Sequence, residues 1–161
     1  MQIKSIIDED FTNYRKPSMF IISAHCSFKC DKENGCNLCQ NSHLAQEPTI
    51  SITTNNILHR YINNEITSAI VFGGLEPFDT DNELLDFIDT ARECFYINDD
   101  IVIYTGYTEE ELSNNFYFQQ IIQYPNIVIK FGRFRPNQNS HYDKILGVNL
   151  CSDNQYAKRY N

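Results

Sequence analysis

Four short apolar runs, each followed by residues suited to a turn or a ligand site, constrain the fold of this chain most. The runs are Met19–Ser23, Ala69–Phe72, Ile101–Tyr104 and Ile127–Phe131. The segments between them place apolar residues at helical spacing, over 54–63, 81–95 and 108–124. Thr53 or Thr54 is predicted to cap the first of these helices, and Thr108 with Glu111 forms a capping box for the third. Short buried strands that alternate with helices are typical of a parallel sheet covered by helices.

We therefore predict an α/β fold: a partial, open βα barrel of about four to six mostly parallel strands with flanking helices. The chain of 161 residues is expected to form one domain, residues 1–161, and it is too short for a complete barrel of roughly 250 residues. The polar segment 136–143 is predicted to be a loop, and Lys144–Leu150 a final strand. Ligands bind such sheets at the carboxyl ends of the strands. The residues that follow the four runs are Cys26, Gly73-Gly74, Thr105-Gly106 and Gly132.

The acidic composition excludes some classes of partner. A net charge of -8 argues against tight nucleic-acid binding, which depends on Lys and Arg contacts to phosphates. The small basic group of Lys130, Arg133 and Arg135 does not reverse that argument. No run approaches the roughly 18 apolar residues of a membrane span, and the first residues do not resemble a signal peptide. We expect a cytoplasmic protein with neither a nucleic-acid nor a membrane partner.

Four of the six cysteines lie in one polar loop directly after the first apolar run: Cys26, Cys30, Cys36 and Cys39. Cysteines of a reducing compartment are poor disulfide candidates, and this density indicates a metal site. Zinc would take four ligands in a closed tetrahedron. A 4Fe–4S cluster could use three, which leaves one iron open to a small molecule. The spacing alone does not choose between these metals. The other two cysteines, Cys94 and Cys151, are interpreted as packing residues.

Two further motifs follow the second and third apolar runs. Gly73-Gly74-Leu75-Glu76-Pro77 lets a ligand approach the backbone closely, and Thr105-Gly106-Tyr107 has the composition of a strand-to-helix turn. Each motif is weak when it is taken alone.

Taken together, these motifs resemble those of radical S-adenosylmethionine proteins. More narrowly, they are similar to the family of activating proteins of anaerobic ribonucleoside-triphosphate reductases. The matching residues run from the cysteine loop almost to the end of the chain: Cys26-x3-Cys30, Cys39-Gln40-Asn41, Gly73, Gly74, Glu76, Pro77, Thr105-Gly106-Tyr107 and Ser152-Asp153-Asn154-Gln155. The chain departs from the family in the long interval between Cys30 and Cys39, in the inserted Leu75, and at Lys130-Phe131-Gly132.

The resemblance implies two cofactors, a 4Fe–4S cluster and S-adenosyl-L-methionine. Three of the four loop cysteines would hold the cluster, with Cys36 the least expected ligand. The cofactor-binding residues implied are Asn41, Gly73, Gly74, Glu76 and Thr105. Reductive cleavage of S-adenosylmethionine would produce a radical that removes hydrogen from a glycine of the partner, so no catalytic side chain is implied.

The partner implied is an anaerobic ribonucleotide reductase or another glycyl-radical enzyme, with an electron donor such as flavodoxin or ferredoxin. Two alternatives remain open. One is a radical S-adenosylmethionine enzyme that acts on a small substrate, and the other is a zinc-binding interaction module without catalysis.

Overall fold

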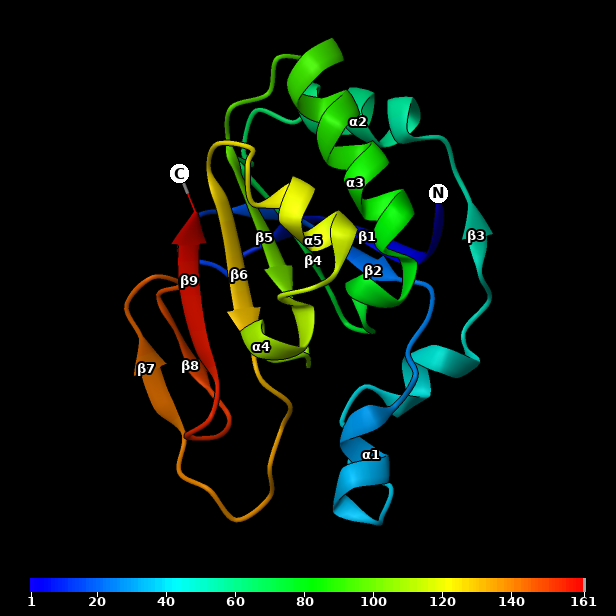
Figure 1. Ribbon diagram of the computed structural model, residues 1–161. Coiled ribbons are helices and arrows are strands. Elements are labelled where there is room, and N and C mark those ends of the chain that lie inside the picture. The colour runs from blue at the N-terminus through cyan, green and yellow to red at the C-terminus, as the bar shows by residue number, and fades with distance from the viewer. Residues whose placement is uncertain (161) are drawn as a thin grey trace.

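The computed structural model describes residues 1–160 as an α/β fold built on a mixed sheet of seven strands (Figure 1). The sheet order is β3-β1-β2-β4-β5-β6-β9, and β7 and β8 form a separate two-stranded sheet. The strands are β1 (Gln2–Asp10), β2 (Ser18–Ser23), β3 (Ile50–Ser51), β4 (Ala69–Gly73), β5 (Asp100–Tyr104), β6 (Ile127–Phe131), β7 (His141–Asp143), β8 (Val148–Leu150) and β9 (Tyr156–Tyr160). The central strands β2, β4, β5 and β6 are parallel, whereas β1, β3 and β9 pair antiparallel. The partial barrel stays a prediction.

The helical segments are short. They are α1 (Lys29–Asn34), the 3₁₀ turns η1 (Ser42–Gln46) and η2 (Pro77–Thr80), α2 (Thr54–Ile62), α3 (Asp81–Asp89) with its π-helical extension η3 (Thr90–Cys94), α4 (Glu109–Leu112) and α5 (Phe116–Ile121). None of the helices described within residues 1–160 is long and apolar enough to cross a membrane.

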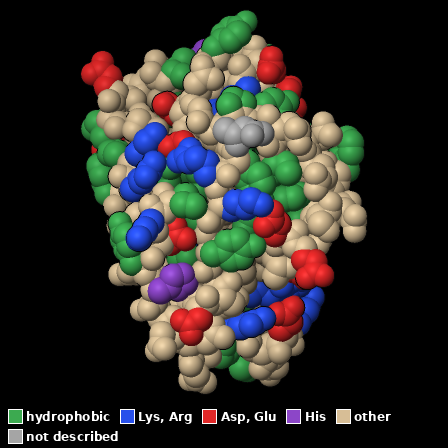
Figure 2. Space-filling view, turned by 60° about the vertical axis from the view of Figure 1, so that its left-hand side comes forward, with side chains coloured by type: hydrophobic (Ala, Val, Ile, Leu, Met, Phe, Trp, Pro, Cys, Tyr) green, Lys and Arg blue, Asp and Glu red, His purple; other side chains and the backbone are tan. Residues whose placement is uncertain are grey.

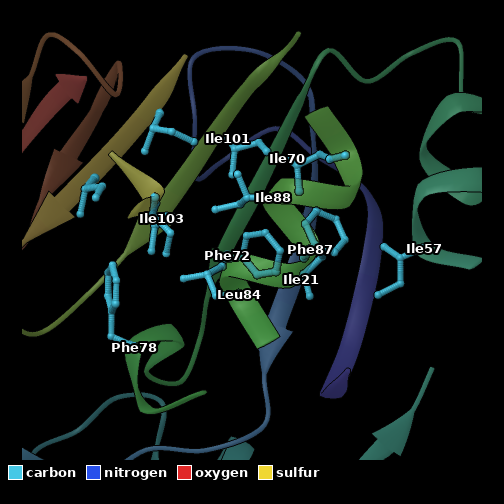
Figure 3. Close-up of a cluster of buried hydrophobic side chains, with 14 of the residues drawn as sticks. Ile21, Ile57, Ile70, Phe72, Phe78, Leu84, Phe87, Ile88, Ile101 and Ile103 are labelled. Atoms are coloured by element: carbon cyan, nitrogen blue, oxygen red, sulfur yellow. The ribbon is translucent and has the colours of Figure 1, made fainter. Parts of the chain in front are cut away.

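The four parallel strands are mostly apolar because both of their faces are covered. Helices α2, α3 and α5 lie on one face of the sheet (Figure 1). Figure 3 shows how Ile70 and Phe72 of the sheet meet Leu84 and Phe87 of α3 on that side. The rings of Phe72 and Phe87 pack edge to face with centroids 4.9 Å apart. The alternate residues point to the other face, where a second cluster includes Phe20, Val71, Val102, Val128, Leu146 and Leu150.

The predicted helix caps are confirmed. The Thr53 hydroxyl accepts a hydrogen bond from the backbone N–H of Asn56, and Thr108 forms the full capping box with Glu111. The single helix predicted over 108–124 is wrong, because the chain breaks it into α4 and α5. Asn115 causes the second start: its side chain accepts from the N–H of Phe118 at 2.8 Å and caps α5.

The two ends of the chain differ most from the prediction. The segment 136–143 is not loop throughout, because His141–Asp143 forms β7. Only Val148–Leu150 of the predicted last strand is extended. The residues before it turn around Asp143, whose carboxylate accepts from the N–H groups of Ile145 and Leu146 at 2.9 Å. Strands β1, β3 and β9 were not predicted.

The face that carries β9 comes forward in Figure 2, where Lys and Arg side chains lie among acidic and apolar ones. Ion pairs hold this region together: Lys16 and Arg159 with Asp100, and Lys158 with Glu109. These basic groups are therefore engaged with carboxylates of the same chain.

Candidate functional site

A cavity of about 500 Å³ opens at the carboxyl ends of the four parallel strands, between the cysteine loop and the β7–β8 hairpin. Most of the site residues predicted from the sequence line it: Cys26, Cys30, Cys39, Asn41, Gly74, Glu76 and Thr105. Gly73 and Cys36 are not among its lining residues. The topology thus brings together motifs that lie far apart in the sequence.

The cysteine loop stands off the sheet beyond the carboxyl ends of the strands, with α1 at its far end (Figure 1). Phe28 begins α1 from a left-handed conformation with φ of 51°, and Gly35 ends it in the same region with φ of 67°. No residue from His25 to Thr53 is buried. Leu44 and Ile52 pack against the core while only partly buried, so polar contacts contribute much of what holds this loop in place.

Three of the four loop thiols share one environment. Partial burial of the Cys26 thiol raises its pKa to about 12, although the N–H of Phe28 opposes this by donating to its sulfur at 3.4 Å. Partial burial raises the pKa of Cys30 to about 11. The neighbouring Cys39 thiol, which is hydrogen-bonded to Cys30, is the next cause of this rise. Cys36 is exposed, and its thiol donates to the carbonyl of Asn34 at 3.3 Å. In the absence of metal the thiols of Cys26 and Cys30 stay protonated near neutral pH, so metal binding at these two must release protons.

The donor set fits a sulfur-bound iron centre. Within residues 1–160, no three or more His, Cys, Asp or Glu side chains surround a single metal-ion position. The three cysteines Cys26, Cys30 and Cys39 line the same cavity. Soft thiolates are the ligands that iron–sulfur clusters take, and a cluster binds each thiolate at a different iron.

The carboxylate of Glu76 joins the end of β4 to the turn after β5. One oxygen, Oε1, accepts from the hydroxyl of Thr105 at 2.7 Å and from the N–H of Phe78 at 3.1 Å. The other, Oε2, accepts from the N–H of Gly106 at 2.7 Å. Burial raises the pKa of Glu76 to about 7 despite these donors. Glu76 and Thr105 thus hold two cavity-lining turns together, and their contact with a cofactor stays a prediction.

Gly74 occupies a position that no other residue fits without strain. Its φ is 76°, and a Cβ added there would lie 2.8 Å from Cγ2 of Ile22 and 3.3 Å from Cδ1 of Leu44. At Gly73 an added Cβ would lie 3.2 Å from the ring of Phe20 and from Cβ of Tyr104. The glycine pair thus permits the backbone after β4 to pass close to its neighbours at the cavity wall.

Sequence reasoning missed other cavity residues, among them Tyr104, Lys130, Phe134 and Cys151. Lys130 is buried, and its ammonium donates to the carbonyl of Gly132 at 2.7 Å. Burial lowers the pKa of Lys130 to about 8. A lysine inside the otherwise apolar run of β6 was the available signal. Nothing local distinguishes Cys151, which reaches the cavity through the packing of the β7–β8 hairpin.

Comparison with known proteins agrees with this site. Residues 17–156 match the sequence family described as a 4Fe-4S single cluster domain. The match includes the cysteine loop and all four parallel strands. No curated protein and no solved structure matches the chain. Because the match spans most of its length, the chain belongs to the family of 4Fe-4S single cluster domains.

Proposed function

We propose that this protein is a radical S-adenosylmethionine enzyme that generates a glycyl radical on an anaerobic ribonucleotide reductase. The observation that carries the proposal is the shared cavity. Cys26, Cys30 and Cys39 line the same space of about 500 Å³ as the backbone after β4 and the turn after β5. Small-molecule sites have volumes of roughly 300–1,000 Å³, so the space beside the thiols suits a cofactor of that class.

In this proposal Cys26, Cys30 and Cys39 hold the cluster. When bound, the cluster supplies the electron that reductively cleaves the sulfonium of S-adenosylmethionine. Gly74 lets the backbone after β4 pass close to Ile22 and Leu44, and in this proposal the methionine portion lies beside that backbone. The apolar side chains of Phe20 and Leu44 exclude water beside it. The chain supplies orientation and shielding, and no side chain acts as an acid or a base.

The size of the cavity supports a protein substrate. A space of about 500 Å³ that holds S-adenosylmethionine leaves little room for a second large molecule. A loop of a partner protein needs little space inside the cavity, because it can reach the bound cofactor from the open side. The partner proposed is the anaerobic ribonucleotide reductase, or another glycyl-radical enzyme, with flavodoxin or ferredoxin as the electron donor.

The test uses anaerobic protein reconstituted with iron and sulfide. With a reductant and S-adenosylmethionine, we expect methionine and 5′-deoxyadenosine in equal amounts by chromatography. Addition of the cognate reductase should then give the doublet of a glycyl radical in electron paramagnetic resonance. The Cys26→Ala variant is the control and should give neither signal.

Each other outcome selects a different function. Cofactor cleavage without a radical on any glycyl-radical enzyme points to a small substrate. A complete cluster that never cleaves S-adenosylmethionine rejects the radical chemistry. Zinc that persists in stoichiometric amount after reconstitution identifies a zinc-binding interaction module.

A further inference from the structure

The side chain of Tyr107 is connected to residues that adjoin the first two cysteines of the loop. Tyr107 follows β5, and its hydroxyl donates to Oδ1 of Asp79 at 2.7 Å. The other oxygen of Asp79 accepts from the backbone N–H of Ser27. Ser27 directly follows Cys26, so this chain of hydrogen bonds ends at the peptide unit beside the first cysteine.

The ring face of Tyr107 makes a second, independent contact with the loop. The ammonium of Lys29 lies 4.1 Å from the ring centroid, at a distance typical of a cation–π interaction. Lys29 directly precedes Cys30 and is the first residue of α1. Tyr107 is therefore connected to the neighbours of two cysteines. Its hydroxyl is linked through Asp79 to Ser27, and its ring face contacts Lys29.

Arg133 supports the same ring and the same helix. Its guanidinium carbon lies 5.6 Å from the Tyr107 centroid, and both of its terminal nitrogens donate to Glu111 at 2.7 and 2.8 Å. Its Nε also lies 3.4 Å from a carboxylate oxygen of Glu33 in α1. Arg133 is itself buried at 8% side-chain exposure, so its packing restricts the ring more than a solvated pair would.

We propose that Tyr107, acting through Asp79 and Lys29, is a positioning residue that fixes Cys26 and Cys30 for cluster binding. The loop from His25 to Thr53 has no buried residue, and its apolar residues that pack against the core, Leu44 and Ile52, lie well after Cys26 and Cys30 in the sequence. Side chains that orient metal ligands from outside the coordination sphere generally contribute to metal affinity. The inference rests on the 4Fe-4S family assignment and is independent of any reaction with S-adenosylmethionine.

The decisive variant is Tyr107→Phe, which keeps the ring and removes the hydrogen bond to Asp79. Reconstituted protein is mixed with a ferrous chelator, and the rate of iron release is followed by absorbance. We expect release about 10-fold faster than from the wild type, the lower end of the effect of such outer contacts. The electron paramagnetic resonance spectrum of the reduced cluster should also change, which a general loss of stability would not cause.

Tyr124→Phe is the matched control, because its hydroxyl donates to Asp89 at 2.6 Å in a Tyr–Asp pair outside the loop. It should release iron at the wild-type rate. Lys29→Gln removes the cation over the ring together with its exposed ion pair to Glu111 at 4.0 Å, and it should give an intermediate rate. If Tyr107→Phe does not fold, Lys29→Gln decides: faster release supports the proposal and unchanged release overturns it. Folded Tyr107→Phe with the wild-type rate and spectrum also overturns it.

Discussion

The surroundings of the loop cysteines distinguish the three expected ligands from Cys36. Cys26, Cys30 and Cys39 line the cavity, whereas Cys36 is exposed and hydrogen-bonded to a local carbonyl. We expect Cys26→Ala, Cys30→Ala and Cys39→Ala each to lose most of the iron bound after anaerobic reconstitution. Cys36→Ala should retain about four irons per chain, the content of one 4Fe–4S cluster.

Iron and sulfide analysis of the purified variants measures this directly. A Cys36→Ala protein without iron, beside an iron-containing Cys26→Ala protein, would show that the ligand set is Cys30, Cys36 and Cys39. All four variants losing iron would indicate a site that needs every thiol of the loop.

A comparison of Gly74 with Gly35 distinguishes the effect of backbone strain on stability from the effect of a steric clash. Both have a positive φ, 76° and 67°, but a Cβ at Gly74 meets Ile22 at 2.8 Å and a Cβ at Gly35 meets nothing within 4 Å. Both Ala variants incur the conformational cost of roughly 1–2 kcal/mol. Gly74→Ala should lose a further ~1–3 kcal/mol of unfolding free energy through overpacking. Urea denaturation of the apoproteins measures the difference, and equal losses would contradict the close contact.

At the level of single residues, the sequence could predict the parts of the site that have a local signal. The cysteine spacing and the Gly73-Gly74 pair were recognisable without any structure. The spacing alone does not show which thiol turns outward; the resemblance made Cys36 the least expected ligand, and the structure places Cys36 at the surface. Lys130 had a local signal, as a lysine inside the apolar run of β6, whereas only the tertiary fold reveals that Cys151 reaches the cavity.

The strand β9 is joined to the sheet by a buried carboxylate as well as by its ladder with β6. Asp100 of β5 pairs with Arg159 of β9 and with Lys16 at 2.6 Å, and it accepts from the hydroxyl of Tyr14 at 3.0 Å. Burial opposes ionisation of Asp100, but these three donors outweigh it and lower the pKa to about 2. The carboxylate therefore links the last strand, a central strand and the segment before β2.

We expect Asp100→Asn to lower the unfolding free energy at pH 7 by about 2 kcal/mol, since it weakens hydrogen bonds to a charged group. The folded pKa lies below the ordinary value of 3.8, so this stabilisation is present above pH 3.8 and is lost as the pH falls toward 2. Urea denaturation of the wild-type and Asp100→Asn apoproteins should show a smaller difference in unfolding free energy at pH 3 than at pH 7. A constant difference would mean that the ion pairs do not stabilise the fold.

Among the elements, the buried strands were predictable and the edge strands were not. A parallel strand covered on both faces must be apolar throughout, and β4, with sequence AIVFG, shows this directly. The last strand, β9, reads YAKRY, and most of its side chains are exposed. In β1, register shifts between Ile3 and Ser5 and between Ile7 and Asp10 interrupt the alternation of inward and outward side chains. Strands of this kind, at the edge of the sheet or next to it, carry too little apolar pattern to be recognised.

Over the whole molecule, a well-packed sheet supports a loop that packs little. The core residues of β2, β4, β5 and β6 are almost all fully buried, whereas residues 25–53 contribute none to the core. The glycine turn after β4 and the network around Tyr107 connect the two parts. The sheet and its helices should therefore fold without metal. The geometry of the thiols, in contrast, should depend on metal binding.

Hydrogen exchange followed by mass spectrometry tests this division of the molecule. Segments with few buried contacts open at a low free-energy cost, so amides of residues 26–47 should exchange rapidly in the metal-free protein while the strands stay protected. Metal binding at thiols couples to local folding, so reconstitution with iron and sulfide should slow exchange in 26–47 by at least about 10-fold and leave the sheet unchanged. The metal-treated Cys26→Ala protein is the control and should resemble the apoprotein. Slow exchange of the loop before metal is added would mean that the thiol geometry is preformed.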